Sequence, residues 1–196
     1  MATDDTQAGA LLGRSDDQAR LLELAAGARS RRGAAITIVG APGVGKTALL
    51  RAVAPAGVRA IDVTAAHSEV TLPWTGLAAL LEPLIGYETA LTPTARGALR
   101  GALALEQPTV ADSARVLHAA VALLRAAGAQ EPLVLRIDDV QWLDPSSRQA
   151  IAFIARRAAS IGIAAIAVWS QRGEPFEPWP GVRAPARPRG SAPRWS

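Results

Sequence analysis

The chain has 196 residues, is 49% hydrophobic and contains no cysteine. This length can bury one substantial core, and the lack of cysteine excludes disulfide frameworks and thiolate metal sites. The formal net charge is +4, with acidic and basic residues interspersed, so the high isoelectric point mostly reflects the twenty arginines and direct DNA binding is not expected.

Membrane and export signals are also missing from the sequence. No run of about 18 apolar residues is free of charges, so no membrane-spanning helix is predicted. The first ten residues are acidic and polar, which excludes a secretory signal peptide. We therefore expect a cytoplasmic protein, with residues 1–10 disordered.

The first predicted element is a helix. Ser15 and Gln18 fit a capping box, and the apolar face that follows predicts a helix to about Ser30. A short apolar run at residues 35–39, rich in β-branched side chains, predicts a buried strand. A glycine-rich stretch at residues 40–47 follows it directly.

The next segment repeats this order of helix and strand. A helix is predicted from Lys46 to a point before Pro55, and a second strand at residues 58–64. Pro73 is expected to open another helix, which Pro83 ends or bends because proline lacks the N–H that a helix interior needs.

Two further helices precede the third strand. Thr92 with Pro93 predicts a helix start. A long helix at residues 112–127 is expected to stop at Gly128, since glycine often follows a helix C-terminus. The apolar run at residues 133–138 predicts the third strand.

The last regular elements are a helix and a strand. Asp144 is expected to cap a helix with Pro145 at its first position, and residues 163–169 predict the fourth strand. Strands separated by helices predict an α/β fold with a mostly parallel sheet and helices on both faces, in three layers. Residues 175–196 carry six of the 14 prolines and predict a disordered, Pro/Arg-rich tail.

The stretch at residues 40–47 reads GAPGVGKT and matches the phosphate-binding pattern G-x-x-x-x-G-K-[ST]. Glycines let backbone N–H groups turn toward phosphate oxygens, and the start of the next helix adds partial positive charge. Lys46 is the only lysine of the chain, and its compact ammonium fits a phosphate cradle better than the wide fork of arginine. Thr47 supplies a hydroxyl to Mg²⁺. The residues predicted to bind ATP are Gly40, Ala41, Pro42, Gly43, Val44, Gly45, Lys46, Thr47 and Ala48.

The third strand ends in two carboxylates. Asp138 and Asp139 would lie at the carboxyl edge of a parallel sheet, where ligands bind. Asp138 is expected to hold Mg²⁺, and Asp139 to orient and deprotonate the attacking water. The alternative is an ordinary capped turn, in which aspartate is common.

Two arginines have open interpretations. Arg172, just past the fourth strand, occupies the place of a group that senses the γ-phosphate, and an ordinary solvated arginine fits equally well. Arg136 lies within the third strand. Either it faces an edge and extends its head group to solvent, or the sheet is less buried there than usual.

Five segments together resemble a known family: LLGRSDDQARL at 11–21, IVGAPGVGKTALLRA at 38–52, LPWTGLAALLEPL at 72–84, LTPTARGALRGAL at 91–103 and LVLRIDDVQWLDPSS at 133–147. The chain resembles the N-terminal ATPase module of large LuxR-type (maltose-regulator-like) transcriptional regulators. These belong to the STAND branch of the AAA-type P-loop ATPases, with an Orc-like AAA ATPase domain. The resemblance implies a domain at residues 11–174 with a helical insert at about 72–127.

The resemblance also implies roles for single residues. Arg14 would lie at the adenine edge, Lys46 and Thr47 at the phosphates and Mg²⁺, Asp138 at Mg²⁺, and Asp139 would act as the base. The family continues with a fifth strand, a winged-helix arm, helical repeats and a C-terminal helix-turn-helix, none of which is found in this sequence. We therefore expect a P-loop fold lacking the last core strand and the downstream domains. The unpaired edge of the strand at 35–39 is then expected to promote self-association.

These observations predict a Mg-ATP-binding domain with weak or regulated hydrolysis, the nucleotide switch of a LuxR-type regulator without its DNA-binding part. Its expected partners are ATP or ADP, further copies of the chain, and related regulators. The alternative is a non-catalytic nucleotide-binding interaction protein or truncated remnant. A GTPase is disfavoured because no N-K-x-D motif is possible, and a nucleotide kinase because no phosphate-acceptor lid is found.

Overall fold

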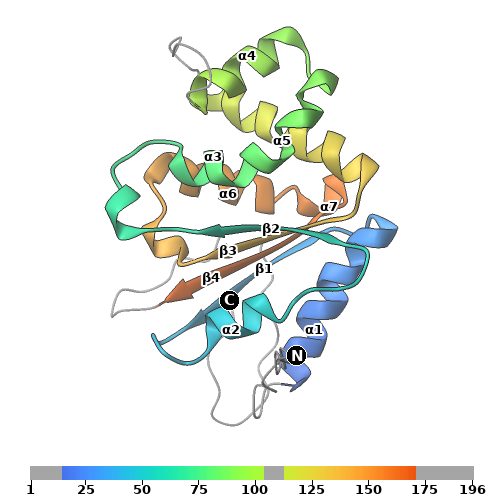
Figure 1. Cartoon of the computed structure of the whole chain (residues 1–196), viewed down its shortest axis with the longest axis vertical. Helices are drawn as coiled ribbons and strands as arrows, with labels where there is room; N and C mark the ends of the chain where they lie inside the picture. The colour runs from blue at the N-terminus through green and yellow to red at the C-terminus, as the bar shows by residue number, and fades with distance from the viewer. Residues whose placement is uncertain (1–14, 104–112, 171–196) are drawn as a thin grey trace, which may run out of the picture.

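The computed structural model describes residues 15–103 and 113–170. Within them, one four-stranded sheet has the order β1-β4-β3-β2, with every pair parallel (Figure 1). The strands are β1 (Ala34–Gly40), β2 (Arg59–Thr64), β3 (Leu133–Asp138) and β4 (Ala164–Ser170). The predicted α/β class and the four predicted strands are confirmed. Because the strands are parallel, their carboxyl ends meet at one edge of the sheet.

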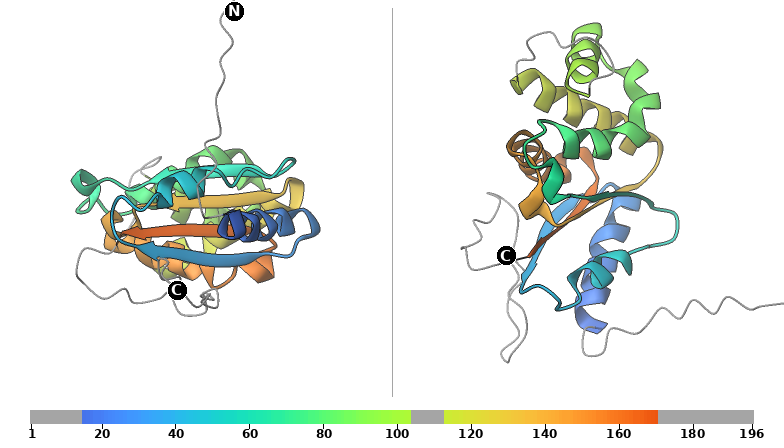
Figure 2. Two further views of the ribbon diagram at one scale, coloured as in Figure 1. Left: turned by 90° about the horizontal axis from the view of Figure 1, so that it is seen from below. Right: turned by 60° about the vertical axis from the view of Figure 1, so that its left-hand side comes forward.

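Helices cover both faces of this sheet. On one face lie α1 (Ser15–Ala26), continued by a 3-10 turn η1 (Gly27–Ser30), and α2 (Lys46–Arg51). The other face is covered by α3 (Thr75–Leu81), α5 (Ser113–Gln130), α6 (Pro145–Ala155) and α7 (Ala158–Ile161). The two views of Figure 2 show the resulting three layers, and α4 (Pro93–Ala102) packs on α5 farther from the sheet.

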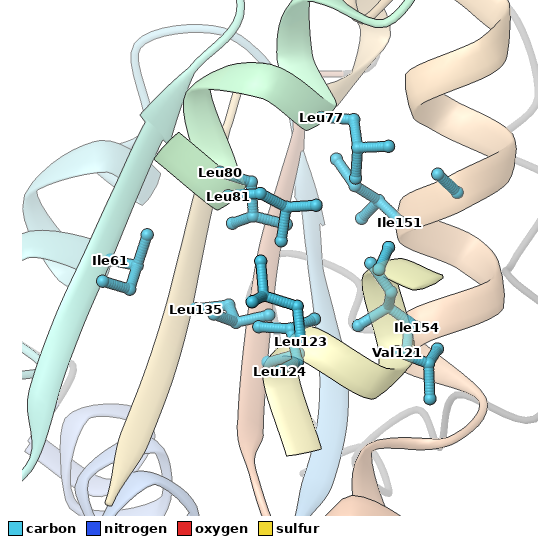
Figure 3. Packing of buried hydrophobic residues seen from close by; sticks show 14 of the residues in the cluster. Ile61, Leu77, Leu80, Leu81, Val121, Leu123, Leu124, Leu135, Ile151 and Ile154 are labelled. Atoms are coloured by element: carbon cyan, nitrogen blue, oxygen red, sulfur yellow. The ribbon is translucent and has the colours of Figure 1, made fainter. Parts of the chain in front are cut away.

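The sheet separates two hydrophobic clusters. The larger one joins β2 and β3 to α3, α5 and α6, and Figure 3 shows leucines of α3 and α5 meeting Leu135 and Ile151. The smaller one packs α1 and α2 on the opposite face. It contains Leu21, Leu49 and Ile166, each no more than 2% exposed. Because both faces of the sheet are packed against helices, the strands are held in position. The loops that follow the strands at the carboxyl edge are therefore held in position as well.

Two predicted helix boundaries were wrong. The long helix does not stop at Gly128 but continues to Gln130. A Cβ on Gly128 would lie 3.1 Å from Cγ2 of Ile163, so the glycine permits close packing within the helix rather than ending it. The helix expected from Pro73 begins at Thr75, because Trp74 has a left-handed backbone with φ of 69°.

The expected signals at Thr92 and Pro83 agree with the structure. The side chain of Thr92 accepts a hydrogen bond from the N–H of Ala95 at the start of α4. Helix α3 ends before Pro83, which lies in a 3-10 segment, η3 (Glu82–Ala90). None of the helices in the described ranges has both the length and the apolar character needed to cross a bilayer.

Arg136 is explained by its position opposite Asp62 in the β2–β3 register. Its Nε and Nη2 each lie 2.6 Å from a carboxylate oxygen of Asp62. Its Nη1 donates to the carbonyls of Arg51 and Val53 at the end of α2, at 3.2 and 3.0 Å. The first alternative is right that the side chain faces the edge strand β2 and wrong that its head group extends to solvent. The side chain ends in an ion pair rather than in solvent and is 12% exposed.

Candidate functional site

The glycine-rich loop joins the carboxyl end of β1 to α2. Gly40 is the last residue of the strand, and α2 begins at Lys46. Gly43 and Gly45 have φ of 79° and 81°, in the left-handed region that side chains disfavour. Residues 41–43 are exposed, so the backbone of the loop is accessible to a ligand.

Lys46 lies beneath this exposed loop. The residue is 4% exposed, and its Nζ donates to the carbonyl oxygen of Ala41 at 2.6 Å. Thr47, next to it, is half-buried, and Ala48 is exposed. The N–H of Leu49 is bound to the Gly45 carbonyl, so the N–H groups of residues 46–48 precede the first donor of the helical ladder.

The two predicted carboxylates lie at the end of β3. Asp138 is the last residue of the strand and is 4% exposed, and its Oδ1 accepts a hydrogen bond from the N–H of Asp139 at 3.0 Å. Asp139 has a left-handed backbone with φ of 53°, which aspartate tolerates better than most residues. Its Oδ1 accepts from Nε2 of Gln141 at 2.7 Å. The short turn η4 (Val140–Trp142) follows.

Ser170 lies between the loop and the acidic turn. It ends β4 and is in register with Gly40 of β1. Its N–H donates to Oε1 of Gln141 at 2.9 Å, and its Oγ is 3.4 Å from Oδ1 of Asp139. The ends of β1, β4 and β3 therefore bring the loop, Ser170 and Asp139 to one edge of the sheet.

Gln141 and Ser170 were not predicted as site residues. The available signal for Ser170 was a polar residue directly after an apolar strand, but the prediction went to Arg172, two residues later. Gln141 follows the two aspartates in sequence. Gln141 belongs to the site because its side chain accepts a hydrogen bond from the N–H of Ser170 in β4, 29 residues away. No local sequence pattern indicates that contact.

Asp144 is also buried, but its contacts hold two helices together and do not belong to the candidate site. Its carboxylate accepts from the N–H groups of Ser147 and Trp74, both at 2.9 Å, and of Gly76 at 3.4 Å. It caps α6, as predicted, and also holds the start of α3. The side chain of Ser147 adds a bond from the N–H of Leu77 at 2.8 Å. Asp144 is a structural residue, since these donors account for its burial.

The side chains present at the candidate site are of the kinds that bind Mg²⁺ together with a nucleotide. Within the described residues, no group of three His, Cys, Asp or Glu side chains lies together to hold a metal. Mg²⁺ is usually held by one or two carboxylates together with phosphate oxygens and water rather than by an all-protein cage. One buried carboxylate, Asp138, and one hydroxyl, Thr47, match that pattern. Arg14 and Arg172, the remaining predicted site residues, lie outside the described residues.

A parallel sheet with a glycine-rich loop after β1 and carboxylates after β3 defines an α/β protein of the P-loop NTPase type. The family model described as AAA ATPase domain matches residues 10–166, and the chain belongs to this family. Membership indicates nucleotide binding, usually with Mg²⁺. Neither the comparison with curated proteins nor the comparison with solved structures finds a match.

Proposed function

We propose that this chain binds ATP or ADP with Mg²⁺ on the loop at residues 40–48 and hydrolyses ATP slowly. The observation that carries the proposal is Lys46. It is the sole lysine of a chain with twenty arginines, and it is buried under an accessible glycine loop. Its Nζ donates to the Ala41 carbonyl within that loop, which places the ammonium beside the backbone groups that would bind phosphate. A bound phosphate is an anion that this loop is built to hold beside the ammonium.

The proposed roles rest on the sequence motifs and the family resemblance, and the loop and the acidic turn lie at the same edge of the sheet. The backbone N–H groups of the loop and Nζ of Lys46 bind phosphate oxygens. Thr47 and Asp138 would hold Mg²⁺, which when bound would neutralise charge on the phosphates. Asp139 orients the attacking water and accepts its proton. Arg14 at the adenine edge and Arg172 at the γ-phosphate complete the proposed site.

The biological role is proposed from the resemblance to LuxR-type regulators of the STAND branch. The segments at 72–84 and 133–147 that carry the resemblance are in contact in the structure. Asp144 accepts from the N–H groups of Trp74 and Gly76, and Ser147 accepts from that of Leu77, at the start of α3. In such a regulator the nucleotide would switch the protein between inactive and assembled states, in the cytoplasm and without DNA contacts from this chain.

Self-association is part of this proposal. In the described part of the chain, β1 pairs with β4 on one side, and its other side carries no strand. A strand edge with unpaired backbone groups promotes association with another strand. We propose a second copy of the chain, or a related regulator, as its partner.

The experiment is titration calorimetry of the purified chain with ADP and with ATP, each in the presence of Mg²⁺. Lys46→Ala should weaken binding about 10- to 100-fold, because one charge-assisted contact of roughly 1.5–3 kcal/mol is lost. Lys46→Arg should not restore binding, because the wider guanidinium does not fit the cradle.

Arg51→Ala is the matched control. It removes an exposed cation from the other end of α2 and should leave the affinity unchanged. Equal affinities of the wild-type and Lys46→Ala proteins would contradict nucleotide binding at this loop.

A further inference from the structure

The side chain of Gln141 joins two groups at the candidate site. Its Nε2 lies 2.7 Å from Oδ1 of Asp139, and its Oε1 lies 2.9 Å from the backbone nitrogen of Ser170. A backbone N–H can only donate, and an ionised carboxylate can only accept. An amide, with one donor end and one acceptor end, therefore satisfies both partners at once, and its orientation is determined by them.

The backbone of the Gln141 turn is held in place as well. Nη2 of Arg148 donates to the carbonyls of Gln141 and Leu143, at 3.2 and 3.1 Å. The Arg148 guanidinium also lies 5.7 Å from the ring centroid of Trp169, the residue before Ser170. The turn after β3 and the end of β4 are thus connected through Gln141 and Arg148.

The contact on Asp139 leaves that carboxylate with a defined orientation. The bonds from Gln141 and Ser170 both fall on Oδ1. Oδ2 is then the oxygen that can accept a proton from water. A hydrogen bond to an ionised acceptor is shorter and stronger than a neutral one, so the bond from Gln141 can fix the rotamer of Asp139.

We propose that Gln141 is a positioning residue for ATP hydrolysis: it holds the Asp139 carboxylate in the orientation that activates water, and it ties that carboxylate to the end of β4. This inference rests on the proposed function, since it requires Asp139 to act on a water beside bound ATP. Gln141 itself does not contact the nucleotide in this mechanism. Its loss should lower the hydrolysis rate and spare binding.

The decisive variant is Gln141→Glu. The glutamate can still accept from the N–H of Ser170, but it presents an oxygen instead of an N–H to Asp139. Single-turnover hydrolysis of labelled ATP, with protein in excess and Mg²⁺ present, should slow roughly 10- to 100-fold, as expected for a misplaced catalytic group. The affinity for Mg-ATP should stay within about 3-fold of wild type, which is under 1 kcal/mol.

Gln149→Glu is the matched control, because it makes the same chemical change at an exposed position of α6. It should leave rate and affinity unchanged. Gln141→Met, which removes the amide without adding charge, should show the same loss of rate and replaces Gln141→Glu if that variant does not fold.

A double-mutant cycle separates positioning from a general structural effect. In the Asp139→Asn background, Gln141→Glu should cause no further loss of rate, because the carboxylate that it positions is already gone. An equal loss in both backgrounds, a wild-type rate in Gln141→Glu, or a loss of Mg-ATP affinity matching the loss of rate would each overturn the proposal.

Turnover by the wild-type protein that is no faster than turnover by Lys46→Ala would also overturn the proposal for Gln141. Retained Mg-ATP binding in that case would leave the proposed nucleotide binding intact, whereas absent binding would remove both.

Discussion

At the scale of single residues, the uneven use of arginine and lysine has a physical explanation. Arginines repeatedly bind backbone carbonyl oxygens: Arg31 donates to Ala129 at 2.8 Å and Arg59 to Pro83 at 2.9 Å, and Arg136 and Arg148 each reach two carbonyls. The planar guanidinium has five donors in a fixed fork, which suits such multiple contacts. Lys46 donates to one carbonyl, that of Ala41, and in the proposed function its compact charge binds phosphate.

Replacement of Asp139 distinguishes a protein that hydrolyses ATP from one that only binds it. Asp139→Asn keeps the size of the side chain but removes the proposed base, so hydrolysis should fall by about 10²-fold or more while Mg-ATP affinity is retained. The measurements are the single-turnover rate and calorimetric binding on the same preparation. Hydrolysis by the Asp139→Asn protein at the wild-type rate would exclude Asp139 as the base. Hydrolysis absent from both proteins would favour a chain that binds nucleotide without catalysis.

At the scale of secondary-structure elements, α2 is short and depends on contacts beyond its own hydrogen bonds. It spans Lys46–Arg51, and a helix of six residues is not stable by itself. Its apolar face packs through Leu49 and Leu50, and Arg136 of β3 binds the carbonyls of Arg51 and Val53 at its end. A cation at a helix C-terminus is also favoured by the helix dipole. Arg136 thereby connects the helix of the glycine loop to the sheet.

Arg136→Ala should lower the free energy of unfolding by about 2 kcal/mol, because two carbonyls and Asp62 lose their shared donor. Asp62→Ala should cost less than about 1 kcal/mol, since its carboxylate is 60% exposed and the two carbonyl contacts remain. Urea unfolding of both variants measures the difference. An Asp62→Ala protein as unstable as Arg136→Ala would show that the ion pair, and not the bonds to α2, is the stabilising contact.

At the scale of the whole molecule, the candidate site lies where separate parts of the fold meet. The loop is attached to the smaller cluster through α2, whereas the acidic turn is followed by α6, which packs in the larger cluster on the opposite face. A ligand that bridges the loop and the turn would therefore be coupled to the stability of both clusters. Binding to the folded state alone stabilises it by mass action.

Saturating Mg-ATP should accordingly raise the melting temperature. At a ligand concentration of about 100 times Kd the stabilisation is about 2.7 kcal/mol, which corresponds to roughly 5–10 °C for a domain of this size. Thermal unfolding with ATP in magnesium and in EDTA measures the shift, and Lys46→Ala provides the control. A shift of the same size in Lys46→Ala would mean that the nucleotide binds elsewhere.

The regular elements, apart from two helix boundaries, and the glycine loop could be predicted from the sequence. The third strand was predicted at its observed bounds, and the caps at Thr92 and Asp144 were found by their local patterns. These features depend on neighbouring residues, so short stretches of sequence suffice to predict them. The glycine loop and the two aspartates were found in the same way, because their chemistry requires particular residue types at fixed spacing.

Which of these elements lie side by side could not be predicted from local patterns and is known only from the three-dimensional structure. Strand β4 lies between β1 and β3, so Ser170 stands beside the loop and binds Gln141, 29 residues away. Arg136 finds its partner Asp62 at a separation of 74 residues, and Gly128 serves packing against Ile163 rather than the end of a helix. Such contacts follow from strand order and from the close packing of distant segments. No local pattern of residues contains that information.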